Sequence, residues 1–150
     1  MLVIRPIRAG DRAEWGRLWT AYLTFYETVL PQEVYDGSFA RLLSDAAHDY
    51  NGLIALQDGQ AVGLAHYLFH RDMWSVQNIC YLQDLFVDPG TRGSGVGRAL
   101  IAAVHNAAKD AGAFELYWHT QSFNQTARRL YDQVAELTPF VRYAQAVERG

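Results

Sequence analysis

The sequence has little cysteine, no long apolar run and no excess of positive charge. Cys80 is the one cysteine among 150 residues, which excludes an internal disulfide and a cysteine-rich zinc site and favours a reducing, cytoplasmic location. The longest uninterrupted apolar stretch, residues 99–104, is far too short to cross a bilayer, so we expect no membrane partner. Arginines at positions 5, 8 and 12 also argue against an N-terminal secretory signal.

Charge and hydrophobicity narrow the class of ligand. The 13 lysines and arginines and 16 aspartates and glutamates give a net charge of −3, whereas a surface that binds nucleic acid needs a pronounced basic excess. Half of the residues are hydrophobic and 19% are charged, which is enough apolar surface for a core and too much for a disordered chain. We therefore expect residues 1–150 to form a single domain that binds something small.

Periodicity and turn residues predict ten elements in the order β-α-α-β-β-β-α-β-α-β. Because hairpins alternate with crossover helices, this order predicts an α/β (α+β) fold with a mixed, mostly antiparallel sheet flanked by helices. The predicted strands cover residues 2–7, 53–57, 60–69, 79–87, 114–119 and 140–147, and the predicted helices begin after Asp11, run through 39–46 and 96–111, and begin after Asn124.

Three local signals support particular boundaries. Asp11 stands at an N-cap position with Glu14 three residues later, as in a capping box. Asp58-Gly59 separates two apolar runs and suits the positive φ angles of a type I′ hairpin turn. Asn124 is a preferred N-cap residue for the last helix.

The segment with the clearest chemistry is a glycine-rich loop between an apolar strand and an apolar helix. Gly93, Gly95 and Gly97 alternate there, flanked by Arg92 and Arg98. Glycine lets the backbone approach a ligand closely, successive amides in such a loop form a cradle for anions, and the helix N-terminus adds positive partial charge. Two guanidinium groups beside such a cradle predict a site for a diphosphate.

Two common phosphate motifs do not fit this loop. A P-loop needs Gly-Lys-Ser/Thr at the start of the helix, but Arg98 and Ala99 follow Gly97. A nicotinamide-dinucleotide fold needs G-x-G-x-x-G within repeated βαβ units, and the predicted hairpins break that repetition. A nicotinamide oxidoreductase is therefore disfavoured.

The loop resembles the acetyl-CoA signature (Arg/Gln)-x-x-Gly-x-(Gly/Ala) of the GNAT superfamily of N-acetyltransferases, which Arg92-Gly93-Ser94-Gly95-Val96-Gly97 matches. Residues 82–89, Leu-Gln-Asp-Leu-Phe-Val-Asp-Pro, look like the family's central strand. Strand, signature, helix, next strand and Asn-capped helix also follow in the family's order. The resemblance implies the GNAT fold, acetyl-CoA as cosubstrate and no metal.

The resemblance also implies roles for individual residues. The loop amides would hold the pyrophosphate, the backbone of the preceding strand would bind the pantetheine arm, and an amide near Phe86 or Val87 would polarise the thioester carbonyl. Asn124 would hydrogen-bond the arm from the opposite side. The implied cofactor-binding set is Leu85, Phe86, Val87, Arg92, Gly93, Ser94, Gly95, Val96, Gly97, Arg98, Asn124 and Tyr131.

Two residues are candidates for proton transfer. A phenol is protonated at neutral pH, so Tyr131 can donate a proton to the departing thiolate, although it can also be a core residue that anchors its helix. Asp84 can take the proton of the attacking amine through water, although a structural carboxylate fits the same position. Strand alternation turns Asp84 to the face opposite Gln83.

The acceptor side is less well defined. Tyr26 and Glu27, near the end of the aromatic first helix, and Gln83, where polyamine acetyltransferases carry Glu, are the predicted substrate-binding residues. His66 and His70 lie about 13 Å apart on an extended strand, which is too far for a metal pair, and His66 is a possible substrate contact.

The predicted function is direct transfer of an acetyl group from acetyl-CoA to a primary amine of a small molecule or peptide. No activated nucleophile suggests an acyl-enzyme. The alternative is a catalytically inactive acyl-CoA-binding regulatory module, which would keep the glycine loop and need no proton donor. By family resemblance, a C-terminal strand that exchanges between subunits suggests a homodimer.

Overall fold

The computed structural model describes residues 1–148. Within these residues two compact units are present, residues 1–119 and residues 120–148. That the whole chain forms a single domain stays a prediction. The first unit contains β1 (Leu2–Pro6), α1 (Arg12–Phe25), α2 (Gln32–Leu42), β2 (Asn51–Gln57), β3 (Gln60–His70), β4 (Ile79–Val87), α3 (Val96–Asp110), β5 (Leu116–Tyr117) and two 3-10 turns, η1 (Ala9–Asp11) and η2 (Pro89–Thr91); the second contains α4 (Gln125–Val134).

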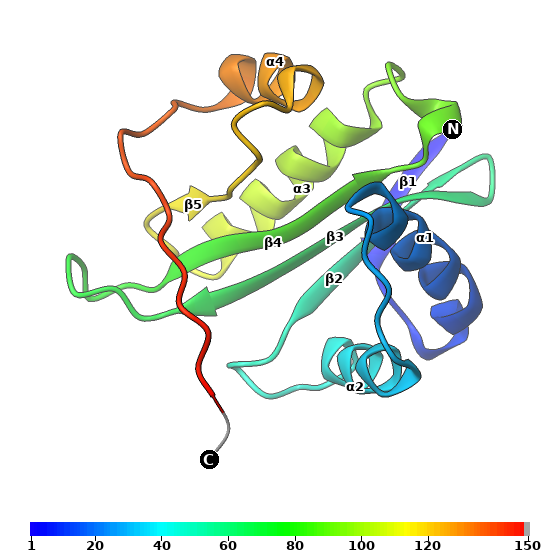
Figure 1. The fold of residues 1–150 in the computed structure, drawn as a ribbon, viewed down its shortest axis with the longest axis horizontal. Coiled ribbons are helices and arrows are strands. Elements are labelled where there is room, and N and C mark those ends of the chain that lie inside the picture. The colour runs from blue at the N-terminus through cyan, green and yellow to red at the C-terminus, as the bar shows by residue number, and fades with distance from the viewer. Residues whose placement is uncertain (149–150) are drawn as a thin grey trace. The chain divides into compact units, whose positions relative to one another are not determined.

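The sheet confirms the predicted mixed, mostly antiparallel topology (Figure 1). Its strands lie in the order β1-β2-β3-β4-β5. All pairs are antiparallel except β4 with β5, which run parallel and pair only at Cys80 with Leu116 and Tyr81 with Tyr117. The predicted element order is confirmed from the first strand to the last helix.

The β2–β3 hairpin confirms the turn predicted at Asp58-Gly59. Asp58 has φ 50° and Gly59 has φ 84°, as a type I′ turn requires. The carboxylate of Asp58 also pairs with the N-terminal amine of Met1, which ties β1 to the hairpin tip.

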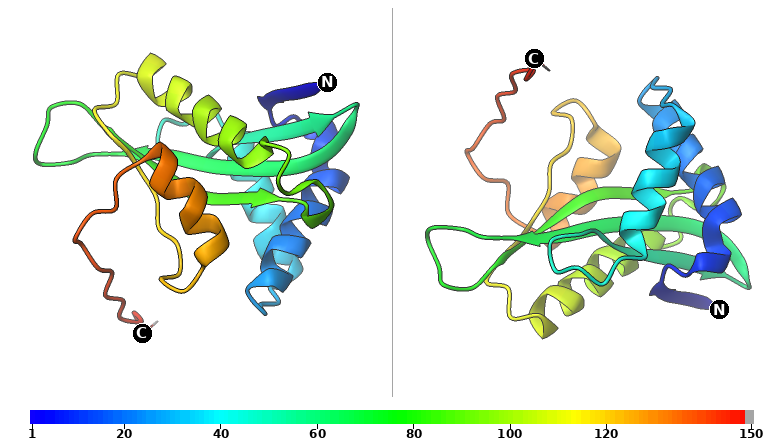
Figure 2. Two further views of the ribbon diagram at one scale, coloured as in Figure 1. Left: turned by 90° about the horizontal axis from the view of Figure 1, so that it is seen from above. Right: turned by 90° about the horizontal axis from the view of Figure 1, so that it is seen from below.

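Helices cover both faces of the sheet, with α1 and α2 on one face and α3 on the other (Figure 2). The core on the α1–α2 face includes Trp15, Leu18, Phe39, Ile54 and Phe86. The aromatic stripe predicted along the first helix therefore supplies core side chains, as burial of large apolar rings favours.

Close packing of α3 against the sheet depends on Gly63 in β3. A Cβ at this position would meet the Leu100 side chain and the Phe86 carbonyl oxygen at 3.0 Å, and the Val96 side chain at 3.3 Å. Val96 and Leu100 are both buried. The missing side chain at Gly63 thus sets how near the start of α3, where the glycine loop ends, lies to the sheet.

The capping prediction at Asp11 was only partly right. Asp11 is the N-cap of α1, but its carboxylate makes no cap hydrogen bond. The carboxylate instead accepts from the Arg5 guanidinium at 2.7 and 2.9 Å and from the Arg8 amide, and the pKa of Asp11 is lowered chiefly by the Arg5 hydrogen bonds. Glu14 accepts from Arg17 at 2.7 Å, so a tertiary ion pair and a helix-surface pair replace the capping box.

Two strand predictions were wrong in extent or existence. The strand expected at 114–119 is reduced to the two residues of β5. Residues 140–147 form no strand in the described chain, although their composition is typical of one. A strand needs a hydrogen-bonding partner edge and a buried face, and here Phe140, Tyr143 and Val147 are exposed.

No helix within residues 1–148 is long and apolar enough to span a membrane.

Gly63→Ala should lower the free energy of unfolding by about 1–3 kcal/mol, because the new methyl group overpacks the contact between β3 and α3. Gly37→Ala is the matched control, since nothing lies within 4 Å of a Cβ at Gly37 in α2, and it should stabilise the protein by about 0.5–1 kcal/mol. Urea denaturation of both variants measures the difference. Equal stabilities would show that α3 has room at this contact.

Candidate active site

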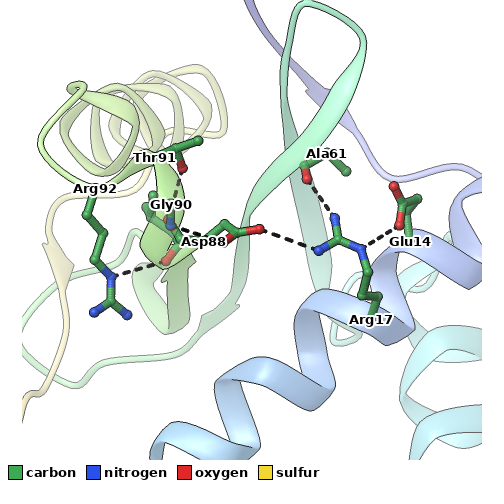
Figure 3. Close-up of polar contacts among 8 residues, drawn as sticks. Glu14, Arg17, Ala61, Asp88, Gly90, Thr91 and Arg92 are labelled. Atoms are coloured by element: carbon green, nitrogen blue, oxygen red, sulfur yellow. Dashed lines mark hydrogen bonds and ion pairs between the residues drawn. The ribbon is translucent and has the colours of Figure 1, made fainter.

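The chain turns sharply where β4 ends, and Asp88 organises the turn (Figure 3). Its carboxylate accepts from the Gly90 amide at 3.2 Å. Its carbonyl accepts from the amide and the hydroxyl of Thr91 at 2.9 and 3.0 Å. These bonds form the 3-10 turn η2 and direct the chain into the glycine loop.

The glycine loop has the backbone conformation that its sequence predicts. Gly93 and Gly95 have φ 85° and 86°, in the left-handed region that other residues resist. The first backbone bond of α3 runs from the Ala99 amide to the Gly95 carbonyl at 3.0 Å. The amides of Val96 and Gly97 therefore precede the helical ladder, at the positive end of the helix dipole, where anions are stabilised.

One edge of β4 is open beside this loop. The Asp88 amide donates to the carbonyl of Val62 in β3 at 2.8 Å, so by alternation the amides of Leu85 and Val87 face away from β3. Among the described strands, β5 pairs with β4 only at Cys80 and Tyr81. The edge from Leu85 to Val87 is thus unpaired by the described strands, whereas the amide of Phe86 is directed toward β3. Binding of the pantetheine arm along this edge stays a prediction.

Arg92 lies against the same edge. Its Nε donates to the Val87 carbonyl at 3.3 Å (Figure 3), and its guanidinium lies 5.7 Å from the centre of the Phe25 ring at the end of α1. The exposed guanidinium places a positive charge between the open edge and the loop. Ser94 and Arg98 are also exposed, and the Ser94 hydroxyl donates to the Thr91 carbonyl.

The sequence reasoning missed Arg17, which links α1 to this turn (Figure 3). Its guanidinium donates to Glu14 at 2.7 Å, to the Ala61 carbonyl at 2.8 Å and to Asp88 at 3.4 Å. The carboxylates of Glu14, first, and of Asp88 raise the pKa of Arg17. The spacing of Glu14 and Arg17 indicates a helix-surface pair, but the contact with Asp88 joins residues 71 positions apart and has no local signal.

Asp84 lies on the α1–α2 face of the sheet in a network of side chains. One carboxylate oxygen lies 2.9 Å from Nδ1 of His66 in β3, and the Trp15 indole N–H donates to Nε2 of His66 at 3.0 Å. The Tyr22 ring lies 5.1 Å from that of Tyr26, and the pKa of Tyr22 is raised, first by burial and then by the negative charge of Asp84. The structure therefore joins Asp84 to the predicted substrate residue Tyr26 through Tyr22.

A β-bulge decides the direction of Asp84. Asp84 pairs with His66 and Leu82 pairs with Tyr67, which leaves Gln83 as an extra residue. Because His66 and Tyr67 are neighbours on β3 and face opposite ways, Leu82 and Asp84 also lie on opposite faces. Simple alternation would have placed them on the same face.

The other predicted substrate residues are more exposed. Gln83 is exposed at the bulge. Glu27 is exposed just beyond α1 and has φ 54°. Tyr26 is half-buried, and its ring lies 5.1 Å from that of Tyr22. Of these three, the structure connects only Tyr26 to the Asp84 network.

Asn124 and Tyr131 belong to the second unit. The side chain of Asn124 accepts from the Ala127 amide at 3.2 Å, which confirms the predicted N-cap of α4. Tyr131 is half-buried on α4, on the same helical face as Ala127 and Val134. Their roles toward the cofactor stay predictions.

Within residues 1–148, no group of three or more His, Cys, Asp or Glu residues could hold a metal ion.

The similarity of this chain to known proteins agrees with the geometry of the site. The model of the Acetyltransferase (GNAT) family matches residues 14–135. The chain is 37% identical over 143 residues to the D-amino-acid N-acetyltransferase of Saccharomyces cerevisiae, covering 95% of this chain and 89% of that protein. It is 33% identical over 120 residues to the aminoglycoside N(6')-acetyltransferase type 1 of Stenotrophomonas maltophilia, covering 75% and 71%.

The fold has close structural counterparts. The structure of AAC(6')-Iy in complex with the bisubstrate analogue CoA-S-monomethyl-acetylneamine superposes with a TM-score of 0.78 at 22% identity, covering 98% of this chain and 99% of that one. The chain belongs to the GNAT acetyltransferase family, and it is an acetyl-CoA-dependent N-acetyltransferase. The predicted family, fold class and enzyme class are confirmed.

Gly95→Ala should weaken coenzyme A binding about tenfold, because a side chain at positive φ costs about 1–2 kcal/mol and shifts the loop amides. Gly112→Ala is the matched control at the other end of α3. Gly112 has φ 78°, and nothing lies within 4 Å of a Cβ at either glycine. Both variants should lose similar stability in thermal unfolding, whereas isothermal titration with coenzyme A should weaken only for Gly95→Ala. Equal affinities of the two variants would exclude the loop as the diphosphate site.

Proposed function

We infer that this enzyme transfers the acetyl group of acetyl-CoA directly to the primary amine of a small molecule, with both substrates bound at once. The observation that carries this proposal is the juxtaposition on β4 of an open backbone edge that leads into the glycine loop and a carboxylate, Asp84, on the α1–α2 face. The edge suits the acyl donor, and the carboxylate suits the ammonium group of the acceptor.

The donor side fits coenzyme A by its hydrogen-bonding groups. The amides of Val96 and Gly97 and the left-handed loop suit the paired phosphates. The amide of Val87 can bond the pantetheine arm. The amide of Leu85, next to Asp84 and also directed to the open edge, can donate to the thioester carbonyl as negative charge develops there.

The acceptor side supplies a proton acceptor. An alkylammonium group must lose a proton before its nitrogen can attack the thioester carbon. The carboxylate of Asp84 attracts the ammonium group and takes its proton, directly or through one water. As the carbon–nitrogen bond forms, the carbon–sulfur bond breaks, and the hydroxyl of Tyr131 gives its proton to the leaving thiolate. The new amide nitrogen loses its second proton to water, and Tyr131 regains a proton from water.

Direct transfer is favoured because the chain offers no exposed thiol for an acyl-enzyme. Cys80 is fully buried, and this burial raises the pKa of Cys80 to about 11. A buried neutral thiol is a poor nucleophile. The names of the two relatives above, which specify D-amino acids and aminoglycosides, support a small polar amine as acceptor.

The C-terminal segment supports a homodimer. Leu137, Phe140, Val141, Tyr143 and Val147 are exposed, and the strand expected at 140–147 has no partner in the described chain. A second copy can provide the missing partner edge and cover these side chains. Light scattering should give twice 17.0 kDa. A monomer at assay concentration would contradict this assignment.

The amine acceptor is best found with a panel assayed by release of coenzyme A thiol. D-amino acids and aminoglycosides should be acetylated faster than lysine peptides. Tyr131→Phe should then lower kcat for the preferred amine by about a hundredfold, the low end of general-acid catalysis, with unchanged coenzyme A affinity. Tyr50→Phe, at a half-buried tyrosine between α2 and β2, is the control. Coenzyme A binding by wild type without acetylation of any amine would favour the inactive binding module.

A further inference from the structure

A chain of three hydrogen-bonded side chains leads from the buried core to Asp84. Trp15 of α1, His66 of β3 and Asp84 of β4 are joined end to end, at 3.0 Å between the indole nitrogen and Nε2 and at 2.9 Å between Nδ1 and the carboxylate. The exposed fraction falls from 14% for the Asp84 side chain to 6% for His66 and 0% for Trp15. Only the Asp84 end of this chain is thus near the surface.

Hydrogen-bond chemistry assigns the proton on His66. An indole N–H is a donor only, so Nε2 of His66 must accept and carries no proton. The single ring proton of neutral imidazole then lies on Nδ1, where it is donated to the carboxylate of Asp84. A second proton on Nε2 would break the bond to Trp15 and leave a buried indole N–H without an acceptor, which is costly.

We propose that His66 is a positioning residue: Trp15 holds it in the Nδ1–H tautomer, and in that state it fixes the Asp84 carboxylate toward the amine without accepting the proton itself. This inference rests on the proposed function of Asp84. A histidine next to a proton-accepting carboxylate would ordinarily be a proton relay. Here the far nitrogen is occupied by Trp15, so a proton taken by Asp84 returns to water on the exposed side of the carboxylate.

The titratable groups beside His66 come from β4 and from α1 and its end. They are Asp84 of β4 and, beside Asp84, Tyr22 of α1 and Tyr26 just after that helix. Arg12 of α1 lies over the Trp15 ring, with its guanidinium carbon 5.3 Å from the ring centre. Trp19 also contacts His66 through its ring, with 5.4 Å between the centroids.

Nuclear magnetic resonance tests the tautomer without any assay of activity. Long-range proton–nitrogen spectra of the full chain labelled at histidine should show His66 as the Nδ1–H tautomer. The His66→Asn variant assigns the signals among the 5 histidines. An Nε2–H tautomer of His66 would overturn the proposal.

Variants of His66 separate positioning from simple packing. Asn can present an amide N–H near the place of Nδ1–H, whereas Leu cannot. His66→Asn should keep kcat within about tenfold of wild type, and His66→Leu should lose about a hundredfold, with little change in KM for acetyl-CoA. Equal losses in both variants, or full activity of His66→Leu, would show that the donor to Asp84 does not matter.

Trp15→Phe removes the indole N–H and frees Nε2 of His66. This variant should show a share of the Nε2–H tautomer of His66 in the spectra and a changed pH profile of kcat. Trp19→Phe is the matched control, because Nε1 of Trp19 is buried without a hydrogen-bond partner in the described part of the chain, and it should keep the wild-type profile. If Trp15→Phe and Trp19→Phe gave the same pH profile of kcat, the role of Trp15 would be contradicted.

The same measurements distinguish failure of the proposed function from failure of the positioning role of His66. If wild type acetylates no amine, the spectra still decide whether Trp15 holds the tautomer of His66. If wild type is active and His66 is the Nε2–H tautomer, the function stands and the positioning role is wrong.

Discussion

The bulge at Gln83 is the constraint on which the acceptor side of the site depends. The extra residue in β4 turns Asp84 and Leu82 to opposite faces of the sheet. Leu82 is thereby buried on the face opposite Asp84, while Asp84 meets His66 and Tyr22 on the other. Without the bulge, Leu82 and Asp84 would lie on the same face of the sheet. If that were the face of Leu82, the Asp84 carboxylate would enter the core and be lost from the acceptor site. Bulges near functional sites commonly redirect a side chain in this way.

The donor side depends on how β4 ends. The strand has β3 along one edge, but β5 accompanies it for only two residue pairs on the other. Backbone donors and acceptors are therefore available beside the turn that Asp88 builds. Arg17 ties that turn to α1, and Gly63 lets α3 approach the sheet. Both substrate sides are thus supported by the same few contacts between β3, β4 and α1.

Much of the fold could be predicted because its signals are local. The Asp58-Gly59 turn, the alternating glycines at 93–97 and the Asn124 cap each depend on residues within a few positions, and the structure has them as expected. The prediction of a strand at 140–147 was wrong because composition indicates β-propensity but does not show whether a partner edge is present. The capping box at Asp11 failed because Arg5 competes for the same carboxylate.

The sequence by itself determined the family, the order of elements and the glycine loop, since backbone conformation and hydrophobic periodicity are properties of short segments. Only the tertiary structure decided that Trp15, His66 and Asp84 form one chain of hydrogen bonds and that Arg17 reaches Asp88. These contacts join residues between 18 and 71 positions apart, and strand register with helix packing creates them. A side chain's partners depend on which segments fold together, and no short stretch of sequence contains that information.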